Sequence, residues 1–459
     1  MLALASFAVA TVMLTLDLPQ AVAYALKHDP SLLARHAQVA QAEADYTRLH
    51  AAELPGVAGQ LQTQVAKSEN MPGELSQYGI SPTPEFSLNT AQVTSTWNLW
   101  NGGLSQLQAE QAKRRMEAAR LDLKHAEDQK TIDVASAFYA LANKRVAVNL
   151  ATSDRTYQQA LLAIAQANER VGRVAGVDVL RAQSSEAHSE ATLASDEADA
   201  QNASDALAQD IGAPLDVVFV TAQPLPEPPL PTTPLAQMIA LAERIRPDVA
   251  AANAQLAVAL LANRAIDTDL YPQLSLNAAF GNQFSPTAYG SELESVEQTN
   301  PLLAASGLPL EAVPPRGNPG FWSVGAAATL GFPLIDWGTR HAAHRAARAQ
   351  IDSLTAAYDG TKRSVEVEVR SSLRSAQAAE VALFYAKTAA SAGEESARIA
   401  QLQYRSGLIS FADVSSAQQQ AVSAQTDLQN ARANYLLSLV KLRIALGTYT
   451  PVAAVAVSV

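Results

Sequence analysis

The stretch "RVGRVAGVDVLRAQ" occupies residues 170–183, and "RSGLISFADVSSAQ" occupies residues 405–418. Both have Gly in the third place, Asp-Val in the ninth and tenth places, and Ala-Gln at the end. They lie 235 positions apart (405 − 170), each between two long stretches that are expected to be helical. A short pattern that recurs between long helical segments indicates an internal duplication, the first feature to look for in a sequence.

Other residues recur at constant spacing and extend the duplication over most of the chain. The markers at an offset of 217 are Pro30 with Pro247 and Pro55 with Pro272. Those at an offset of 235 are "WNLWNGG" (97–103) with "FPLIDWG" (332–338), Asp178 with Asp413, and Gly212 with Gly447. Because the offset changes by 18 positions (235 − 217), the second copy is expected to carry an insertion in its loop at 285–320.

Each copy is expected to contain a helix, two strands and two long helices. The first repeat is placed at 16–221 and the second at 236–449, joined by an extended Pro-rich linker at 222–235. The apolar segment 1–15 is interpreted as a clipped signal segment, with an ordinary buried N-terminus as the alternative, and 450–459 as a C-terminal tail. The expected strands are 57–70, 85–100, 274–285 and 321–335; the expected long helices are 103–172, 177–211, 338–406 and 411–446, and shorter helices are expected at 19–53 and 233–270.

The strand segments alternate apolar residues with small or polar ones, which gives each strand one apolar face. They are long enough to cross a bilayer when tilted. Beyond the N-terminal segment no stretch of about 18 uninterrupted apolar residues occurs, so no transmembrane helix is expected. Four strands cannot close a barrel, and open edges are costly in lipid. The sheet is therefore either soluble or shared by several chains, and strand number alone does not decide between two, three or four chains.

The long helical segments carry a seam of mostly small residues. Between Leu104 and Val171 there is no Gly or Pro, which predicts a helix of roughly 100 Å if it is unbroken. The residues of the seam at 3-4 spacing in the last helix are Val414, Ala417, Ala421, Ala424, Leu428, Ala431, Tyr435, Ser438 and Leu442. Small seam residues allow close helix approach, which is consistent with a hollow helical tube or with a plain antiparallel coiled coil.

Composition excludes several classes of function. The net charge of −11 argues against a nucleic-acid partner. The absence of Cys excludes thiol catalysis and Cys-ligated metals and, in the chain as given, a lipid on an N-terminal Cys. His341 and His344 share one helical face, but without a third ligand nearby the sequence predicts no metal site, and only 5 Met residues are present. No phosphate-binding loop, dinucleotide fingerprint or nucleophile elbow occurs, so neither catalytic activity nor a cofactor is expected.

With these features in order, the chain resembles the TolC family of outer-membrane efflux proteins, and within it the OprM/NodT-like branch. The residues that carry the resemblance are the duplicated unit, "RPDVAAANAQLAVA" (246–259), "YPQLSLNAAFG" (271–281), "FPLIDWG" (332–338) and "YRSGLISFADVSSAQ" (404–418). The resemblance implies a mostly α fold with a membrane β-barrel: a homotrimer with a shared 12-stranded barrel (3 × 4 strands) and a coiled α-helical tube. Members of that branch usually carry a lipid-modified Cys near the start of the mature chain, and the sequence as given has none. Either residues are missing at its start, or the protein is a non-lipidated member.

The resemblance also implies a function and partners. It points to a non-catalytic exit duct in the outer membrane that extends into the periplasm. A periplasmic adaptor and an inner-membrane pump, of the resistance-nodulation-division type, would hand over small molecules such as drugs. Two alternatives remain: the same duct serving type I protein secretion, and a soluble coiled-coil scaffold.

In that family the two opening stretches form the periplasmic tip. Gly172 and Gly407 are expected to end one helix at each tip turn, where a left-handed residue is needed. Asp178 and Asp413 follow at the start of the next helix, where an acidic side chain caps the helix and favours its dipole. In the alternative interpretation, copies of these carboxylates form a cation-attracting constriction, and the resemblance supports Asp413 more than Asp178 for this role.

Three further tip residues distinguish this sequence. Ser416 stands where members of the family often have another acid, so a less cation-selective gate is expected. Arg173 and Arg181 lie near the first tip and are interpreted either as locks paired with Asp413 or Asp178 or as solvated basic residues.

Overall fold

The computed structural model describes residues 12–67, 85–172, 175–215, 217–221, 227–284, 299–309 and 321–449. The expected C-terminal tail, Arg173 and most of the expected insertion and signal segment therefore lie outside the described residues. The chain divides into two compact units. Unit 1 contains Met1–Ala42, Arg115–Leu256 and Asp352–Val459, and unit 2 contains Glu43–Arg114 and Ala257–Ile351.

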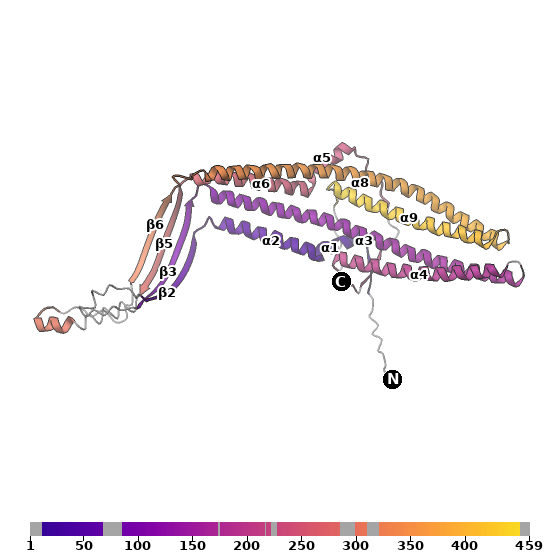
Figure 1. Cartoon of the computed structure of the whole chain (residues 1–459), viewed down its shortest axis with the longest axis horizontal. Coiled ribbons are helices and arrows are strands. Elements are labelled where there is room, and N and C mark those ends of the chain that lie inside the picture. The colour runs from indigo at the N-terminus through magenta and orange to yellow at the C-terminus, as the bar shows by residue number, and fades with distance from the viewer. Residues whose placement is uncertain are drawn as a thin grey trace, which may run out of the picture. The chain divides into compact units, whose positions relative to one another are not determined.

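Unit 2 is built around an antiparallel sheet of four strands. They are β2 (Gly56–Lys67), β3 (Glu85–Trp100), β5 (Gln273–Phe284) and β6 (Phe321–Gly331). The strands lie side by side in the order β2-β3-β5-β6 (Figure 1). The two hairpins of the duplication thus join through β3 and β5, and β2 and β6 form the two edges of the sheet.

The registers of the two hairpins reproduce the sequence offsets. Gly56 pairs with Thr96 in the first hairpin, and Gln273 pairs with Gly331 in the second. These pairs differ by 217 on the first strand (273 − 56) and by 235 on the second (331 − 96), which are the offsets of the sequence markers. The duplication therefore holds residue by residue in the sheet.

Unit 1 contains the hairpin-forming parts of the four long helices. These helices are α3 (Leu104–Arg170), α4 (Gly176–Ile211), α8 (Thr339–Arg405) and α9 (Phe411–Ala445), and Figure 1 shows them as two hairpins, α3–α4 and α8–α9. Helices α3 and α8 each run for 67 residues. Long seams of small residues pack them, and buried Ala residues recur along all four helices.

Each shorter segment that was expected to be a single helix is divided in two by a proline. The first gives α1 (Leu18–His28) and α2 (Pro30–Ala51), and the second gives α5 (Leu235–Ile245) and α6 (Pro247–Asp267). The residue before a proline is driven from helical to extended backbone, and Asp29 (ψ 124) and Arg246 (ψ 133) have this conformation. The expectation of unbroken helices was wrong because it used these prolines only as repeat markers.

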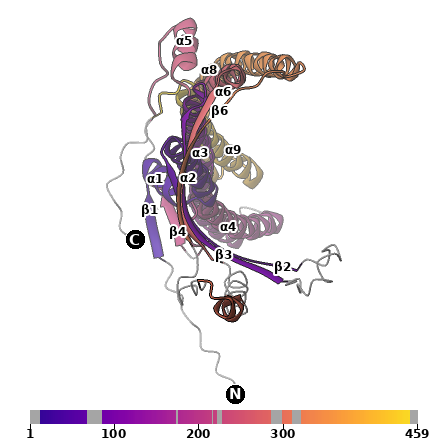
Figure 2. The same ribbon diagram turned by 90° about the vertical axis from the view of Figure 1, so that its left-hand side faces the viewer.

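The core of unit 1 lies where the short helices pack on the long ones. One cluster joins α1, α3, α4, α8 and α9 around Phe138, Leu141 and Leu207, and a second joins α5, α6, α8 and α9 around Met238, Val369 and Leu442. A small parallel ribbon, β1 (Val12–Leu16) paired with β4 (Val217–Thr221), lies beside α1 (Figure 2). This pairing of two distant segments was not expected from the sequence.

Of the described helices, one has the length and mean hydropathy of a membrane span, Pro247–Leu270. Its apolar character comes mainly from Ala and Leu, and it is interrupted by polar residues such as Asn263 and Arg264. Core helices of soluble proteins meet the same criterion, so this property alone does not place the helix in a bilayer.

Candidate functional site

The tip of the α8–α9 hairpin is closed by a glycine turn and a capping box. Gly407 adopts φ 74, and the N–H of Leu408 donates to the carbonyl of Gln403 at 2.9 Å, which ends α8. Ser410 is the N-cap of α9. Its backbone N–H donates to Asp413 Oδ2 at 3.1 Å, and its Oγ accepts from the N–H of Asp413 at 3.3 Å. Asp413 is exposed, yet its carboxylate turns back toward its own helix end.

The tip of the α3–α4 hairpin has a different arrangement. Gly172 adopts φ 71, but Ala175, the N-cap of α4, offers no side-chain cap. Asp178 lies in the first turn of α4 and forms an ion pair with Arg181 of the same helix, 3.3 Å between Arg181 Nη1 and Asp178 Oδ1. Within the described part of the chain no ion pair joins Arg181 to Asp413.

A buried cluster joins the two hairpins behind these turns. It consists of Leu161, Ala165, Val179, Ala182, Ala400, Tyr404, Phe411 and Val414. Tyr404 packs edge-on against Phe411, with ring centroids 6.1 Å apart. Burial and the nearby charge of Asp178 both raise the pKa of Tyr404, so the first acidic tip residue lies near α8 of the other hairpin. Asp178 is half-buried, whereas Asp413 and Ser416 are exposed.

The two histidines noted in the sequence do not gather metal ligands. His344 Nε2 lies 2.9 Å from Asp267 Oδ1, and its Nδ1 lies 3.0 Å from Asn263 Oδ1. Among the residues that the structure describes, no group of three or more metal-ligating side chains occurs.

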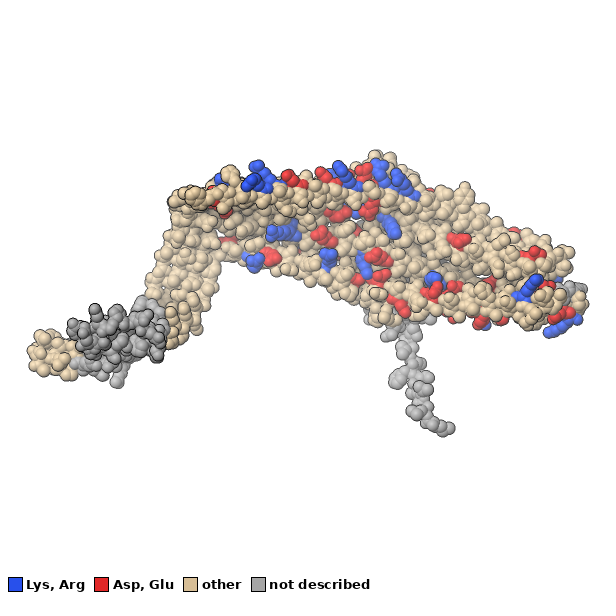
Figure 3. All heavy atoms as spheres, in the orientation of Figure 1, with Lys and Arg blue, Asp and Glu red and all other residues tan. Residues whose placement is uncertain are grey.

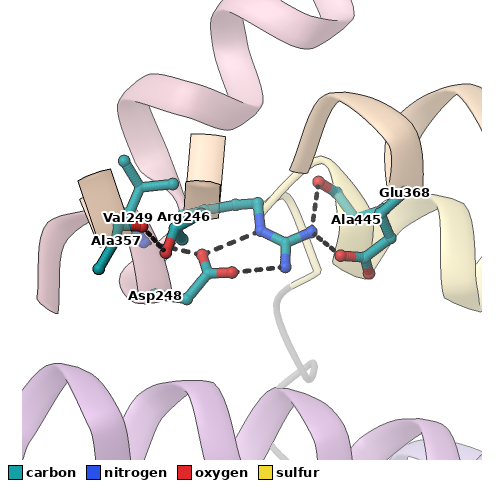
Figure 4. A network of polar contacts seen from close by, with 7 residues as sticks. Arg246, Asp248, Val249, Ala357, Glu368 and Ala445 are labelled. Carbon is teal, nitrogen blue, oxygen red and sulfur yellow. Dashed lines mark hydrogen bonds and ion pairs between the residues drawn. The ribbon is translucent and has the colours of Figure 1, made fainter. Parts of the chain in front are cut away.

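Sequence reasoning missed a buried ion network at the break between α5 and α6. Arg246 is only 5% exposed. Its Nη2 lies 2.8 Å from Asp248 Oδ2, and its Nη1 lies 2.7 Å from Glu368 Oε2 on α8. Nη1 also donates to the carbonyl of Ala445 on α9 at 3.3 Å (Figure 4). The Arg-Pro-Asp triplet was the signal in the sequence, but the partners on α8 and α9 could not be read from it.

The duplicated position in the first repeat carries the opposite charge. Asp29, at an offset of 217 from Arg246 (246 − 29), is also buried. Its Oδ2 lies 2.9 Å from Lys130 Nζ on α3, and its Oδ1 accepts from the N–H of Leu32 at 3.1 Å. In each repeat an ion pair therefore joins the residue before the proline to the long helix of the same repeat. In the first repeat the residue before the proline is the acid, and in the second it is the base.

Low pH is expected to weaken the ion pair between Asp29 and Lys130. Burial alone would raise the pKa of Asp29, but hydrogen bonds from Ser31, Lys130 and Leu32 hold it below its ordinary value. A lowered folded-state pKa stabilises the fold above about pH 4, and this contribution is lost as pH falls through the folded-state value. We expect the helical melting temperature, followed by circular dichroism, to fall below about pH 4, with a smaller fall in the Asp29→Asn variant. An equal acid response in both proteins would contradict this.

The linker between the repeats is held by one carboxylate. Glu227 Oε1 lies 2.6 Å from Arg432 Nε on α9, and Oε2 pairs with Lys387 on α8. The hydroxyl of Tyr435 donates to the carbonyl of Pro228 at 2.6 Å. The linker thus contacts both helices of the second hairpin, while α4 ends at Gly212 near the backbone of His28.

The sheet of unit 2 has two chemically different faces. The pairing registers place on one face Val57, Leu61, Val65, Val93, Trp97, Leu276, Phe280, Trp322, Val324 and Leu330. They place on the other face Gln60, Gln62, Gln64, Gln92, Thr94, Asn277 and Thr329. The only charged residues in the four strands are Lys67 and Glu85, which pair at one end. On the face that Figure 3 shows, charged side chains are scattered over the helices but not over the described part of the strands.

The apolar face of the sheet is exposed in the single chain. Leu61 is 86% exposed, and Val324 and Trp322 are similarly uncovered. Phe280 stacks on Trp322 within this face, with ring centroids 5.3 Å apart. An uncharged apolar face of this extent is unfavourable in water and suits contact with lipid, while the opposite face offers amides and hydroxyls.

Comparisons with known proteins agree with this arrangement. A model of the family described as "Outer membrane efflux protein" matches residues 21–213 and 238–448, which leaves the linker between the two matched segments. Among curated proteins, Protein CyaE of Bordetella pertussis is 36% identical over 119 residues, which is 25% of each chain. The match thus spans about a quarter of that relative's length.

Solved structures with the same fold cover 94% of this chain. The outer-membrane channel OprN is 21% identical with a TM-score of 0.70 over 90% of its chain. The CmeC outer membrane channel of Campylobacter jejuni is 18% identical with a TM-score of 0.71 over 85% of its chain. The open state of the MtrE outer membrane channel of Neisseria gonorrhoeae is 19% identical with a TM-score of 0.69 over 91%.

Proposed function

Because this chain belongs to the outer membrane efflux protein family, which lies in the bacterial outer membrane and extends into the periplasm, we propose that it is a non-catalytic exit duct. The observation that carries the proposal is the two-faced sheet. Its apolar face has no charged residue in the interior of any strand, and its other face is lined by Gln, Asn and Thr. The first face suits lipid and the second suits water.

Three copies are proposed to share one barrel. Strands β2 and β6 lie at the two edges of the sheet, and exposed strand edges are not tolerated in lipid. Cyclic symmetry removes both edges at once, because β6 of one copy meets β2 of the next. The family resemblance supports a trimer among the possible rings.

The long helices are proposed to form the periplasmic part of the duct. In this assignment the tips meet a periplasmic adaptor, and an inner-membrane pump, of the resistance-nodulation-division type, supplies small molecules such as drugs. Glycine turns at Gly172 and Gly407 and the cluster behind them give the tips a defined shape that a protein partner can recognise.

The proposed duct is tested by isolating the full chain from outer membranes in detergent. A heat-modifiable oligomer that conducts ions in planar bilayers is expected, because a shared barrel resists SDS until it is heated. A chain that is extracted without detergent and remains a monomer would refute the duct and favour a soluble scaffold.

The charge at the second tip is expected to set ion selectivity. Asp413 is exposed, and Ser416 lies one helical turn further on the same helix. Ser416→Asp would add a carboxylate per copy to the ring proposed at the tip, so the ratio of cation to anion permeability should rise. Reversal potentials of single channels in a salt gradient measure this ratio, with Ser416→Asn as the uncharged control. An unchanged ratio in the Asp variant would remove the tip ring as the selectivity site.

A further inference from the structure

An exposed hollow lies where β6 leads into α8. Its volume is about 1070 Å³, and its lining combines large apolar side chains, namely Phe332, Leu334, Ile335 and Trp337, with charged ones such as Asp336 and Arg340. Trp337 is 90% exposed and Leu334 is 84% exposed. A group of large apolar side chains exposed together marks a surface that another molecule covers, either lipid or protein.

The duplicated place in the first repeat is already covered within the chain. Gly102, which corresponds to Trp337 at the offset of 235 (337 − 102), lies in the turn after β3. A Cβ added at Gly102 would lie 2.7 Å from Tyr271 Cβ and 3.0 Å from the carbonyl of Thr268. The segment just before β5 therefore closes tightly over the turn that follows β3.

The duplication identifies the segment that should cover the second turn. Tyr271 corresponds to Leu54 at the offset of 217 (271 − 54), just before β2. Leu54 is itself 68% exposed. Strand β2 lies at the opposite edge of the sheet from β6, with β3 and β5 between them. Leu54 therefore cannot reach Trp337 of its own chain across three strand spacings, about 14 Å.

We propose that Leu54 of a second copy seats against Trp337 in this hollow and completes it. This contact between copies corresponds to the contact between Tyr271 and Gly102 within one copy. Within the copy the aromatic ring comes from the segment before the strand (Tyr271), and between copies it comes from the turn after the strand (Trp337). The inference rests on the proposed shared barrel, and it adds the residues and the register by which two copies meet.

The backbone of Trp337 supports a built contact. Trp337 is the one non-Gly residue with positive φ in the described part of the chain, at 49. A bulky residue in this region is strained, and such strain persists where the surroundings require it. Gly102 has φ 66 at the same place, so both turns keep the conformation, but only the second retains a large side chain there.

The same offsets fix the strand register between copies. Within the chain, Ser95 of β3 pairs with Ala278 of β5. Ser95 corresponds to Leu330 of β6 at the offset of 235, and Ala278 corresponds to Leu61 of β2 at the offset of 217. If the copies meet as the two hairpins do, Leu330 of one copy lies opposite Leu61 of the next. Both leucines lie on the apolar face, as an in-register continuation of the sheet demands.

Cross-linking tests the register, and the chain has no Cys of its own to interfere. Directly opposite residues of an antiparallel pair have Cα atoms about 4.5–5.5 Å apart, which a disulfide spans. The full chain carrying Leu61→Cys and Leu330→Cys is expected to give covalent oligomers in oxidised outer membranes that reducing agent converts to monomers. The control combines Leu330→Cys with Thr63→Cys, two positions off on the same face. Equal or better cross-linking in the control would overturn the register.

A size exchange tests the Trp337 contact separately. Trp337→Gly should raise the fraction of oligomer dissociated by SDS roughly tenfold, the factor that about 1.4 kcal/mol corresponds to. Adding Leu54→Tyr to this variant recreates the pair Gly102 and Tyr271 and should restore resistance, whereas Leu54→Tyr alone crowds two aromatic rings and should lower it. Failure of the double variant to recover would overturn the contact.

The two tests also distinguish this contact from the proposed duct. If oligomers form but neither test succeeds, the contact is wrong and the duct stands. If no oligomer forms at all, the duct itself fails.

Discussion

Replacing Arg246 by Ala is expected to lower the free energy of unfolding by about 3 kcal/mol or more. The guanidinium is buried and satisfies Asp248, Glu368 and the carbonyl of Ala445. Its removal leaves the partly buried carboxylate of Asp248 without this ion pair. It also removes the contacts that join the break between α5 and α6 to α8 and α9. The helical circular dichroism signal, followed in detergent against temperature and denaturant, measures the loss.

Two controls separate this network from ordinary surface charge. Arg246→Lys keeps the positive charge but loses the bidentate contact to Asp248, so it should recover only part of the stability. Arg398→Ala removes a solvent-exposed ion pair with Glu395 and should leave the melting transition unchanged. If Arg246→Ala behaves like Arg398→Ala, the network does not stabilise the fold.

Gly212→Ala is the second change with a large expected effect, about 2–4 kcal/mol of destabilisation. Gly212 ends α4 with φ 72, where any side chain is strained. A Cβ there would lie 2.8 Å from the carbonyl oxygen of His28, a backbone atom that cannot move without shifting the break between α1 and α2. The penalty should therefore exceed the backbone strain alone.

The duplication supplies the matched control for this substitution. Gly447 ends α9 at the offset of 235 with φ 69, and the atom nearest to an added Cβ is the side-chain Cγ2 of Ile245, at 3.3 Å, with no backbone atom as close as at Gly212. Gly447→Ala should thus cost only the strain of the left-handed conformation, roughly 1–2 kcal/mol. Thermal unfolding of both variants gives the comparison, and equal losses would show that the contact with His28 carries no cost.

Much of the architecture followed from the sequence alone. The strands and the long helices depend on local periodicity and on the positions of Gly and Pro, which are readable without any partner. The offsets of 217 and 235 were equally readable, and the hairpin registers reproduce them. The breaks at Pro30 and Pro247 were local signals as well, but they were used as repeat markers instead of helix ends.

The tip residues show where local reasoning stops. The glycine turns and the acidic residues after them were expected, and Arg181 was considered as a partner of Asp178. Whether Asp413 acts as a pore-lining group remains a prediction, because its capping box with Ser410 accounts for its orientation within one copy. Local sequence defines such a cap, whereas a ring of carboxylates requires other copies.

The duplicated unit, the strands with one apolar face and the long helices can be predicted from the amino-acid sequence, because each depends on residues that are close along the chain. Which distant charges meet is known only from the folded structure. Asp29 with Lys130 and Arg246 with Glu368 each join residues about a hundred or more positions apart, and the acid and the base exchange places between the repeats. Ion pairs require only that opposite charges come together when helices pack, so no spacing in the sequence encodes them.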